Sequence, residues 1–127
     1  MAEVVLDASA VLAKVFREPG ADRVDAVIHG ARISAVNLAE VAQKLAERGA
    51  AADQVAQIIG DLPCEVEPFE AGAAVSVGLL RLLTRGAGLS LADRACLDLA
   101  RRRKLPAFTA DRAWAELDLG IEVVLIR

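Results

Sequence analysis

The sequence predicts an α/β fold with a central parallel sheet, and two observations carry this prediction. Short apolar, strand-like runs alternate with helical patterns along the whole chain. Glycine and proline residues mark many of the boundaries between these segments. The 127 residues are expected to form a single domain, 1–127, because 55% apolar residues supply one packed core and no low-complexity linker or internal repeat is present.

The individual elements follow from these runs in chain order. The expected strands are 4–6, 33–36, 64–66, 105–108 and 123–126. The expected helices begin at about residue 9 and near 21–28, and then cover 38–48, 51–60, 69–85, 91–103 and 111–116. Gly49 separates two of the helices, whereas Pro63, Pro68 and Pro106 mark the borders of strands or helices. Strands that alternate with helices in this way favour a parallel sheet.

The charge of the chain is divided unevenly. The formal net charge is -3, but residues 1–70 carry 12 acids and 6 bases, whereas residues 71–127 carry 6 acids and 9 bases. A basic surface beside an acidic pocket is therefore compatible with the sequence. The basic run 101–104 also has a simpler explanation, because cations favour the carboxyl end of a helix.

Composition disfavours several other classes of protein. The longest charge-free stretch, 71–80, has ten residues, whereas a membrane-spanning helix needs about 18 or more. Glu3 and Asp7 are incompatible with a signal peptide, so a cytoplasmic protein is expected. Cys64 and Cys96 are too far apart to indicate a disulfide framework and are expected to be buried free thiols.

Four acidic residues each follow a short apolar run and fall at the expected start of a helix: Asp7, Glu40, Asp93 and Asp111. The carboxyl ends of parallel strands share one edge of a sheet, so these side chains are expected to meet there. Helix capping is the competing interpretation. Asp7 and Asp111 suit N-cap positions, and the pairs Asn37 with Glu40 and Ser90 with Asp93 have the spacing of capping boxes.

A divalent cation would reconcile four carboxylates that otherwise repel one another. Because His29 is the single imidazole and the cysteines are isolated, oxygen ligands are expected, and these suit Mg²⁺ or Mn²⁺. Mg²⁺ held by carboxylates binds substrate phosphates, which favours phosphoryl transfer or phosphodiester hydrolysis by an activated water. The sequence has no GxSxG, GxxxxGK[ST] or GxGxxG motif, and one histidine cannot supply a two-histidine ribonuclease mechanism.

Four segments together resemble the PIN-domain ribonucleases and, more narrowly, the VapC-like toxins of type II toxin–antitoxin pairs. They are VVLDASA at 4–10, NLAEV at 37–41, GLSLADRACL at 88–97 and TADRAW at 109–114. The first two are weak motifs, whereas the ordered combination over nearly the whole chain is specific. The resemblance implies a three-layer α/β/α fold with helices on both faces of the sheet. It also implies an Mg²⁺- or Mn²⁺-dependent RNA endonuclease, usually a homodimer, that a cognate antitoxin inhibits.

The resemblance also assigns roles to the four acids by position, as a catalytic and metal-binding set. Asp7 and Asp93 are expected to be direct metal ligands. Glu40 is expected to bind the metal, directly or through water, or to orient the nucleophile. Asp111 is expected to support a second metal.

Four further residues match positions near the site. Ser9 and Thr109 match small hydroxyl positions that hold carboxylates or water, although local backbone capping explains them equally well. Arg94 and Arg112 each follow an acid and are candidates for contacts with RNA phosphates, with ordinary surface ion pairs as the alternative.

Three other features are expected to be structural. Asp98 lies four residues from Arg94 and from Arg102, which favours ion pairing on a helix surface. Trp114 is expected in the core. The apolar residues of 71–85 are more simply explained by core packing than by a homodimer contact.

Two other functions remain as alternatives to the nuclease. A receiver-like phospho-accepting module also gathers acids at strand ends, but the segment 64–67 lacks the aspartate that such a module requires after its third strand. A noncatalytic, antitoxin-binding PIN-like protein would retain the fold, although the intact acids argue against it.

Overall fold

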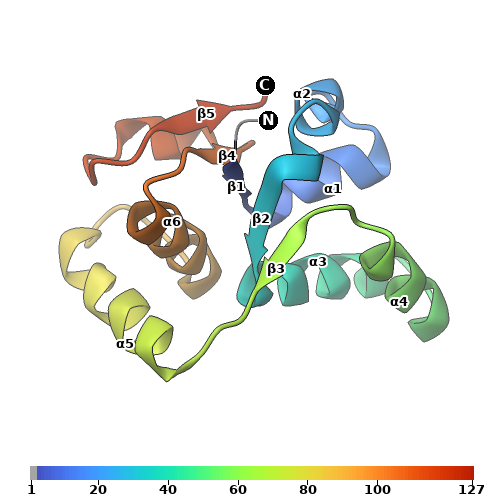
Figure 1. The fold of residues 1–127 in the computed structure, drawn as a ribbon, viewed down its shortest axis with the longest axis horizontal. Coiled ribbons are helices and arrows are strands. Elements are labelled where there is room, and N and C mark those ends of the chain that lie inside the picture. Colours follow the sequence, from blue (N-terminus) through green and yellow to red (C-terminus); the bar gives the residue numbers. More distant parts are fainter. Residues whose placement is uncertain (1–2) are drawn as a thin grey trace.

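The computed structural model describes residues 3–127 and contains a five-stranded parallel sheet with the strand order β3-β2-β1-β4-β5 (Figure 1). The strands are β1 (Val4–Leu6), β2 (Ala31–Ser34), β3 (Glu65–Glu67), β4 (Ala107–Thr109) and β5 (Val123–Leu125). The α-helices are α1 (Ala8–Phe16), α2 (Ala21–Asp25), α3 (Ala35–Glu47), α4 (Ala52–Gly60), α5 (Ala71–Leu80) and α6 (Leu91–Arg103). Three short 3₁₀ helices are η1 (Ile28–Gly30), η2 (Arg81–Leu83) and η3 (Arg112–Glu116).

The central strand β1 divides the core into two parts because its side chains alternate between the two faces of the sheet. Val4 and Leu6 belong to a cluster with residues of α1, α2 and α3. Val5 belongs to a second cluster with residues of α5, α6 and η3. Strand β4 repeats the alternation, since Phe108 packs in the first cluster and Ala107 in the second. Both faces of the sheet are therefore covered, as buried parallel sheets require.

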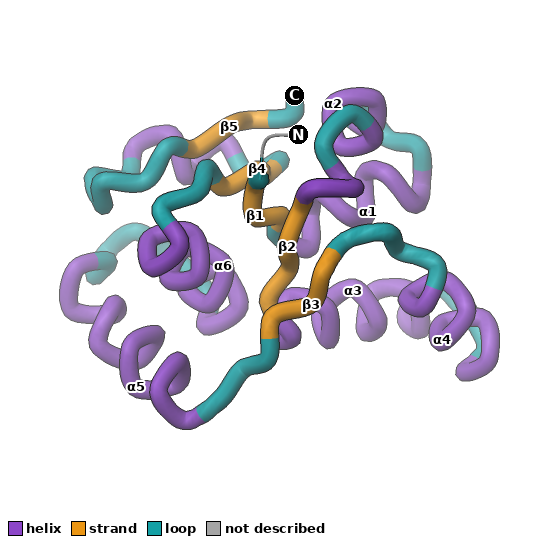
Figure 2. Tube along the Cα trace, in the orientation of Figure 1, coloured by secondary structure: helices purple, strands orange, loops and turns teal. Residues whose placement is uncertain are grey.

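The arrangement of helices confirms the predicted three-layer α/β/α fold. Figure 2 shows the strands crossing the middle of the molecule, with α1 to α4 on one side and α5 and α6 on the other. All strand pairs are parallel, and β1 pairs with both β2 and β4. Within the part of the chain that the structure describes, no helix is long and apolar enough to cross a membrane.

The strand order creates a switch point between β1 and β4. From β1 the chain adds β2 and β3 on one side of the sheet, and it then returns to add β4 and β5 on the other. The carboxyl ends of β1 and β4 therefore lie side by side, and the chain continues from them toward opposite sides of the sheet. In open α/β sheets, ligands bind beside the carboxyl ends of the strands at such a point. Asp7 directly follows β1, and Thr109 ends β4.

Strand β2 and helix α3 correct one prediction. The sequence pattern places the strand at 33–36 and an N-cap at Asn37, but β2 ends at Ser34 and α3 begins at Ala35. Ser34 is the N-cap, and its hydroxyl accepts a hydrogen bond from the Val36 N–H at 3.2 Å. The predicted capping box of Asn37 and Glu40 is therefore wrong. The shift occurs because serine terminates the strand two residues earlier than the apolar run indicates.

The packing of α5 against α6 corrects two more predictions. Asp98 is fully buried, where it accepts hydrogen bonds from the Ser76 hydroxyl and from Arg102 Nε, so its predicted place on the helix surface is wrong. Its pairing with Arg102 is confirmed. The predicted core role of 71–85 holds for Val77 and Leu80 only. Four large side chains remain more than half exposed, namely Val75, Leu79, Leu82 and Leu83.

Candidate active site

Asp7 is the most buried of the four predicted acids and lies where β1 meets α1. Its side chain caps α1, because Oδ1 accepts a hydrogen bond from the Ala10 N–H at 2.9 Å. The hydroxyls of Ser9 and Thr109 donate to the same carboxylate at 2.7 and 2.6 Å. Asp7 has only 4% of its surface exposed. This burial raises the pKa of Asp7 to about 6, although the hydrogen bonds oppose the increase. Repulsion from Asp93 adds to the increase.

Ser9 and Thr109 join the ends of β1 and β4 around this carboxylate. The Ser9 hydroxyl oxygen accepts a hydrogen bond from the Ala110 N–H at 2.9 Å, and the Thr109 hydroxyl oxygen accepts one from the Asp111 N–H at 3.0 Å. Each hydroxyl therefore satisfies the local backbone and also holds Asp7. The two predicted explanations of these residues apply together, since one hydroxyl can donate and accept at the same time.

Asp93 and Glu40 approach the site from two different helices. Asp93 is the third residue of α6, where it completes the predicted capping box. Its Oδ2 accepts from the Ser90 N–H at 3.0 Å, and the Ser90 hydroxyl accepts from the Asp93 N–H at 3.0 Å. Glu40 lies on α3 and is half-buried. Burial raises the pKa of Glu40, and repulsion from Asp93 raises it further, while Asn37 and Lys44 oppose the increase.

These three acids also act electrostatically on Cys96, which is one turn beyond Asp93 on α6. The thiol is fully buried, and burial is the main reason that its pKa lies well above the ordinary value. The charges of Asp7, Asp93 and Glu40 add to this increase. Cys96 is therefore a neutral group beneath the acids, in agreement with the predicted buried free thiol. Cys64 is also free and is half-buried.

Asp111 differs from the other three acids. Its side chain is exposed and caps η3, because Oδ1 accepts a hydrogen bond from the Ala113 N–H at 3.0 Å. It is connected to the site through its backbone N–H, which donates to Thr109. The structure thus brings Asp7, Glu40 and Asp93 together electrostatically and places Asp111 at the rim.

The chemistry of the donors fits a hard divalent cation. All four predicted ligands offer carboxylate oxygens, which Mg²⁺ and Mn²⁺ prefer. Burial and repulsion from Asp93 raise the pKa of Asp7 and of Glu40, and a nearby cation would relieve both effects. Within residues 3–127, however, no three Asp, Glu, His or Cys side chains form a group already close enough to hold a metal ion. Some rearrangement of side chains would therefore accompany binding.

The two candidate RNA-binding arginines have different surroundings. Arg94 is half-buried, and its Nη1 donates to the Leu89 carbonyl at 3.1 Å, so its guanidinium supports the loop before α6. Arg112 is exposed at the start of η3 beside Asp111. Among the described residues, neither arginine forms an ion pair. Arg112 is therefore better placed to meet a ligand.

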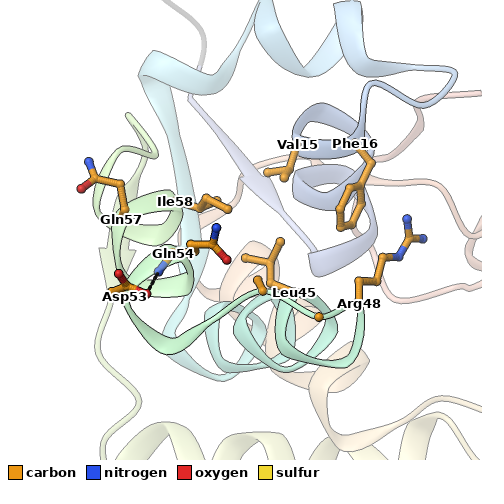
Figure 3. Close-up of a pocket in the computed structure, with 10 residues that line it drawn as sticks. Val15, Phe16, Leu45, Arg48, Asp53, Gln54, Gln57 and Ile58 are labelled. Atoms are coloured by element: carbon orange, nitrogen blue, oxygen red, sulfur yellow. Dashed lines mark hydrogen bonds between the residues drawn. The ribbon is translucent and has the colours of Figure 1, made fainter.

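A large cavity lies away from these acids, between α1, α3 and α4. It has a volume of about 790 Å³ and a mixed lining (Figure 3). Apolar side chains of Val15, Phe16, Leu45 and Ile58 line it together with the polar side chains of Arg48, Asp53, Gln54 and Gln57. The Arg48 guanidinium lies 4.0 Å from the centre of the Phe16 ring at one end. None of the four acids lines this cavity. Sequence analysis did not predict it, because three separate helices contribute its walls and no local motif marks it.

Sequence analysis also missed a buried polar contact between α3 and α6. Asn37 has 1% of its surface exposed, and its Nδ2 donates to the Ala92 carbonyl at 2.9 Å. The sequence pattern assigned Asn37 to a helix cap, so this contact with Ala92 was not predicted. Trp114, in contrast, is fully buried in the second core cluster, which confirms its prediction.

Fold and site together define a three-layer α/β protein with carboxylates beside the switch point of a parallel sheet. The sequence profile of the PIN domain matches residues 4–119, and the chain belongs to the PIN domain family. This match confirms the predicted family. No curated protein sequence matches the chain significantly.

Several solved structures have the same fold, and three illustrate the similarity. A chain of DNA-bound VapBC from Salmonella typhimurium has a TM-score of 0.78 at 20% identity, with 100% of both chains covered. VapC20 from Mycobacterium tuberculosis, described as a sarcin-ricin loop cleaving toxin, has a TM-score of 0.73 at 19% identity and covers 94% of this chain and 98% of that chain. A chain of VapBC-5 from Mycobacterium tuberculosis has a TM-score of 0.62 at 26% identity, and the match covers 100% of this chain and 99% of that chain. The chain is thus similar to VapC-type proteins of toxin–antitoxin systems.

Proposed function

We propose that the chain is a single PIN-like domain that acts as a metal-dependent endoribonuclease, the toxin of a type II toxin–antitoxin pair. The observation that carries the proposal is the buried Asp7 at the switch point, with Asp93 acting electrostatically on both Asp7 and Glu40, in a chain of the PIN domain family. Because the proposed substrate is cellular RNA, we place the protein in the cytoplasm.

Asp7 and Asp93 are the proposed direct ligands of Mg²⁺ or Mn²⁺, and Glu40 and Asp111 complete the donor set. When bound, the cation supplies charge neutralisation and Lewis acidity for phosphodiester hydrolysis. Asp7 is held by Ser9, Thr109 and the α1 N-terminus, so its carboxylate is fixed before a ligand arrives.

Glu40 is the proposed acceptor of the proton that the attacking water loses. It is half-buried, and its raised pKa brings it nearer to neutral pH, where a general base is more effective. The nucleophile is water rather than a ribose 2′-hydroxyl, so the product carries a 5′-phosphate. Arg112 contacts the RNA phosphates, and Arg94 contributes mainly by holding the loop that precedes α6.

The proposed antitoxin binds in the apolar cavity between α1, α3 and α4. Support comes from the size of the cavity and its lining of both apolar and polar side chains, which suits an amphipathic segment of a partner. The chain is also similar to proteins solved as VapBC complexes. A small reading frame beside the gene would identify the partner, and co-purification with its product tests the pairing. Ile58→Asp should weaken this complex by at least about tenfold, which corresponds to about 1.4 kcal/mol.

The proposal includes a homodimer through the exposed apolar stripe of α5 and η2. Val75, Leu79, Leu82 and Leu83 follow a helical spacing and are each more than half exposed, and such patches mark interaction surfaces. Leu79→Glu is expected to convert a dimer into a monomer in light scattering after size-exclusion chromatography. A wild-type chain that is monomeric at high micromolar concentration would contradict this part of the proposal.

The central test is cleavage of structured RNAs by the purified chain with Mg²⁺ or Mn²⁺. Asp93→Asn should abolish cleavage while circular dichroism shows a folded protein, and ligation-based mapping should find 5′-phosphates on the products. Retained cleavage in the folded variant would overturn the proposed site. Absence of both cleavage and metal binding in the wild-type chain would favour the noncatalytic alternative. The receiver-like alternative has lost its basis, because the chain belongs to the PIN domain family.

A further inference from the structure

Asn37 carries a buried oxygen atom that has no hydrogen-bond partner among the described residues. Its Nδ2 donates to the Ala92 carbonyl at 2.9 Å, and its Oδ1 is buried without a donor. A backbone carbonyl only accepts hydrogen bonds, so the amide nitrogen must face Ala92 and the orientation of the amide is fixed. The unpaired atom is therefore the carbonyl oxygen, an acceptor. Buried polar atoms are rarely left unpaired in native proteins, which calls for an explanation.

The position of Asn37 points to the acidic site. It lies three residues before Glu40 on α3, so the two side chains share a helix face. Its partner Ala92 directly precedes Asp93 on α6. The amide thus joins the two helices that carry Glu40 and Asp93. Ionised carboxylates accept hydrogen bonds but donate none, so neither acid can satisfy the Asn37 oxygen. A water molecule that enters the site is a suitable donor.

We propose that Asn37 is a positioning residue, which holds α3 against α6 and accepts a hydrogen bond from water that enters the site with a divalent cation. The inference rests on the proposed function, because it requires the acids to bind such a cation. Mg²⁺ and Mn²⁺ retain part of their hydration when carboxylates bind them, so water donors arrive with the ion. Groups that orient ligands in this indirect way change metal affinity by about 10- to 100-fold when they are removed.

Calorimetry with Mn²⁺ and the RNA-free chain tests the inference without measuring activity. Asn37→Leu keeps the branched shape and the number of heavy atoms and lacks both the donor and the acceptor, and it should bind Mn²⁺ about 10- to 100-fold more weakly than the wild-type chain. Leu45→Ala on the same helix is the matched control. Leu45 is buried five residues beyond Glu40 on α3, in the apolar cluster, so this variant should lose thermal stability and retain its Mn²⁺ affinity within about twofold.

Nuclear magnetic resonance supplies a readout that a purely structural role would not change. Titration of the wild-type chain with Mg²⁺ should shift the Asn37 side-chain carbonyl and amide signals, while the side-chain signals of exposed Gln54 and Gln57 stay in place. The Asn37 shifts should disappear in Asp7→Asn. This measurement decides the question even if Asn37→Leu does not fold.

The outcomes separate this inference from the proposed function. If Asp7→Asn loses Mn²⁺ binding but Asn37→Leu keeps the wild-type affinity, only the role of Asn37 is overturned. If the wild-type chain binds Mg²⁺ but the resonance signals of the Asn37 side chain do not shift, the role of Asn37 is likewise overturned. If the wild-type chain binds neither ion, the proposed metal site and the role of Asn37 fail together.

Discussion

The acidic site and the apolar cavity lie toward opposite ends of the same two helices. Asp7 caps the start of α1, and Phe16 at its end lines the cavity. Glu40 lies in the first half of α3, and Leu45 follows in the second half. In one region, burial and the charge of Asp93 raise the pKa of Asp7 and of Glu40, whereas the other region combines apolar and polar side chains. The same helices therefore support two surfaces with different chemistry.

The difference shows that the cavity and the candidate acidic site are separate features of this protein. The cavity of about 790 Å³ contains none of the four acids, whereas Asp7 lies at the switch point of the sheet, where the charge of Asp93 raises its pKa. A polymer such as RNA needs an accessible edge rather than an enclosing pocket, and a partner segment needs apolar area. We therefore assign hydrolysis to the edge and partner binding to the cavity, and the following changes test that division.

Neutralising one carboxylate in each region should give the largest contrast. Asp7→Asn removes a proposed metal ligand and should reduce the initial rate of RNA cleavage by at least about 100-fold, since even indirect supporting groups cost 10- to 100-fold. Asp53→Asn removes an exposed carboxylate at the cavity and should leave the rate within about twofold. A fluorogenic RNA measures both rates. Equal losses in the two variants would show that general electrostatics, rather than the site, controls cleavage.

Truncating the cavity wall should affect stability and spare chemistry. Leu45 is 2% exposed, so Leu45→Ala should lower the free energy of unfolding by about 2–5 kcal/mol. Cleavage per folded molecule should stay near the wild-type value, because Leu45 packs in the first apolar cluster and lines the cavity, which none of the four acids lines. Urea denaturation and cleavage assays below the transition measure the two quantities. A large fall in the rate of the folded variant would mean that the cavity and the acidic site are coupled.

Sequence reasoning located the acids because each lies within a few residues of a local signal. Asp7, Ser90 and Asp111 cap the helices that the sequence pattern indicates. The prediction for Asn37 was wrong because the end of β2 differs by two residues from the apolar run, and strand ends depend on pairing with neighbours. Asp98 was misplaced because its spacing to Arg102 reveals a helix contact but not the packing of α5 over it.

Long-range packing accounts for the features that the sequence did not reveal. The cavity, the bond from Asn37 to Ala92 and the exposed stripe of α5 all depend on how separate helices meet. Strand alternation, in contrast, is local: Val4, Val5 and Leu6 point to alternate faces whatever the helices do. The fold class was therefore predictable, whereas the surfaces available to partners were not.

Removing the charge of Asp7 should stabilise the metal-free protein at neutral pH. Burial raises the pKa of Asp7 from 3.8 to about 6, so the folded state holds this proton more tightly than the unfolded chain. The resulting stability is present below about pH 4 and is lost as the pH rises through about 6. The difference corresponds to an upper limit of about 3 kcal/mol. Urea denaturation in EDTA should therefore show that the free energy of unfolding of Asp7→Asn rises relative to that of the wild type between these pH values.

The matched variant in the cavity region should show no such pH dependence. Asp53 is exposed, so Asp53→Asn should follow the wild-type profile of unfolding free energy throughout. Saturating Mg²⁺ should reduce the advantage of Asp7→Asn, because a ligand that binds only the folded wild-type protein stabilises it. If Asp7→Asn is instead less stable than the wild type at pH 7 in EDTA, the hydrogen bonds to the carboxylate outweigh its burial.

The smallest expected effect comes from the Thr109 hydroxyl, which tests how the acidic site is held. Thr109→Val keeps the volume but removes the 2.6 Å hydrogen bond to Asp7, and it should lower cleavage by about tenfold. This hydrogen bond opposes the rise in the pKa of Asp7, so the pH at which cleavage reaches half its plateau should move upward. Thr84→Val is the control, because Thr84 is equally buried but bonds to the Leu80 carbonyl. If Thr84→Val shifts the pH profile equally, the loss of a hydroxyl acts through stability. A shift that is confined to Thr109→Val shows that the Thr109 hydroxyl lowers the pKa of Asp7 directly.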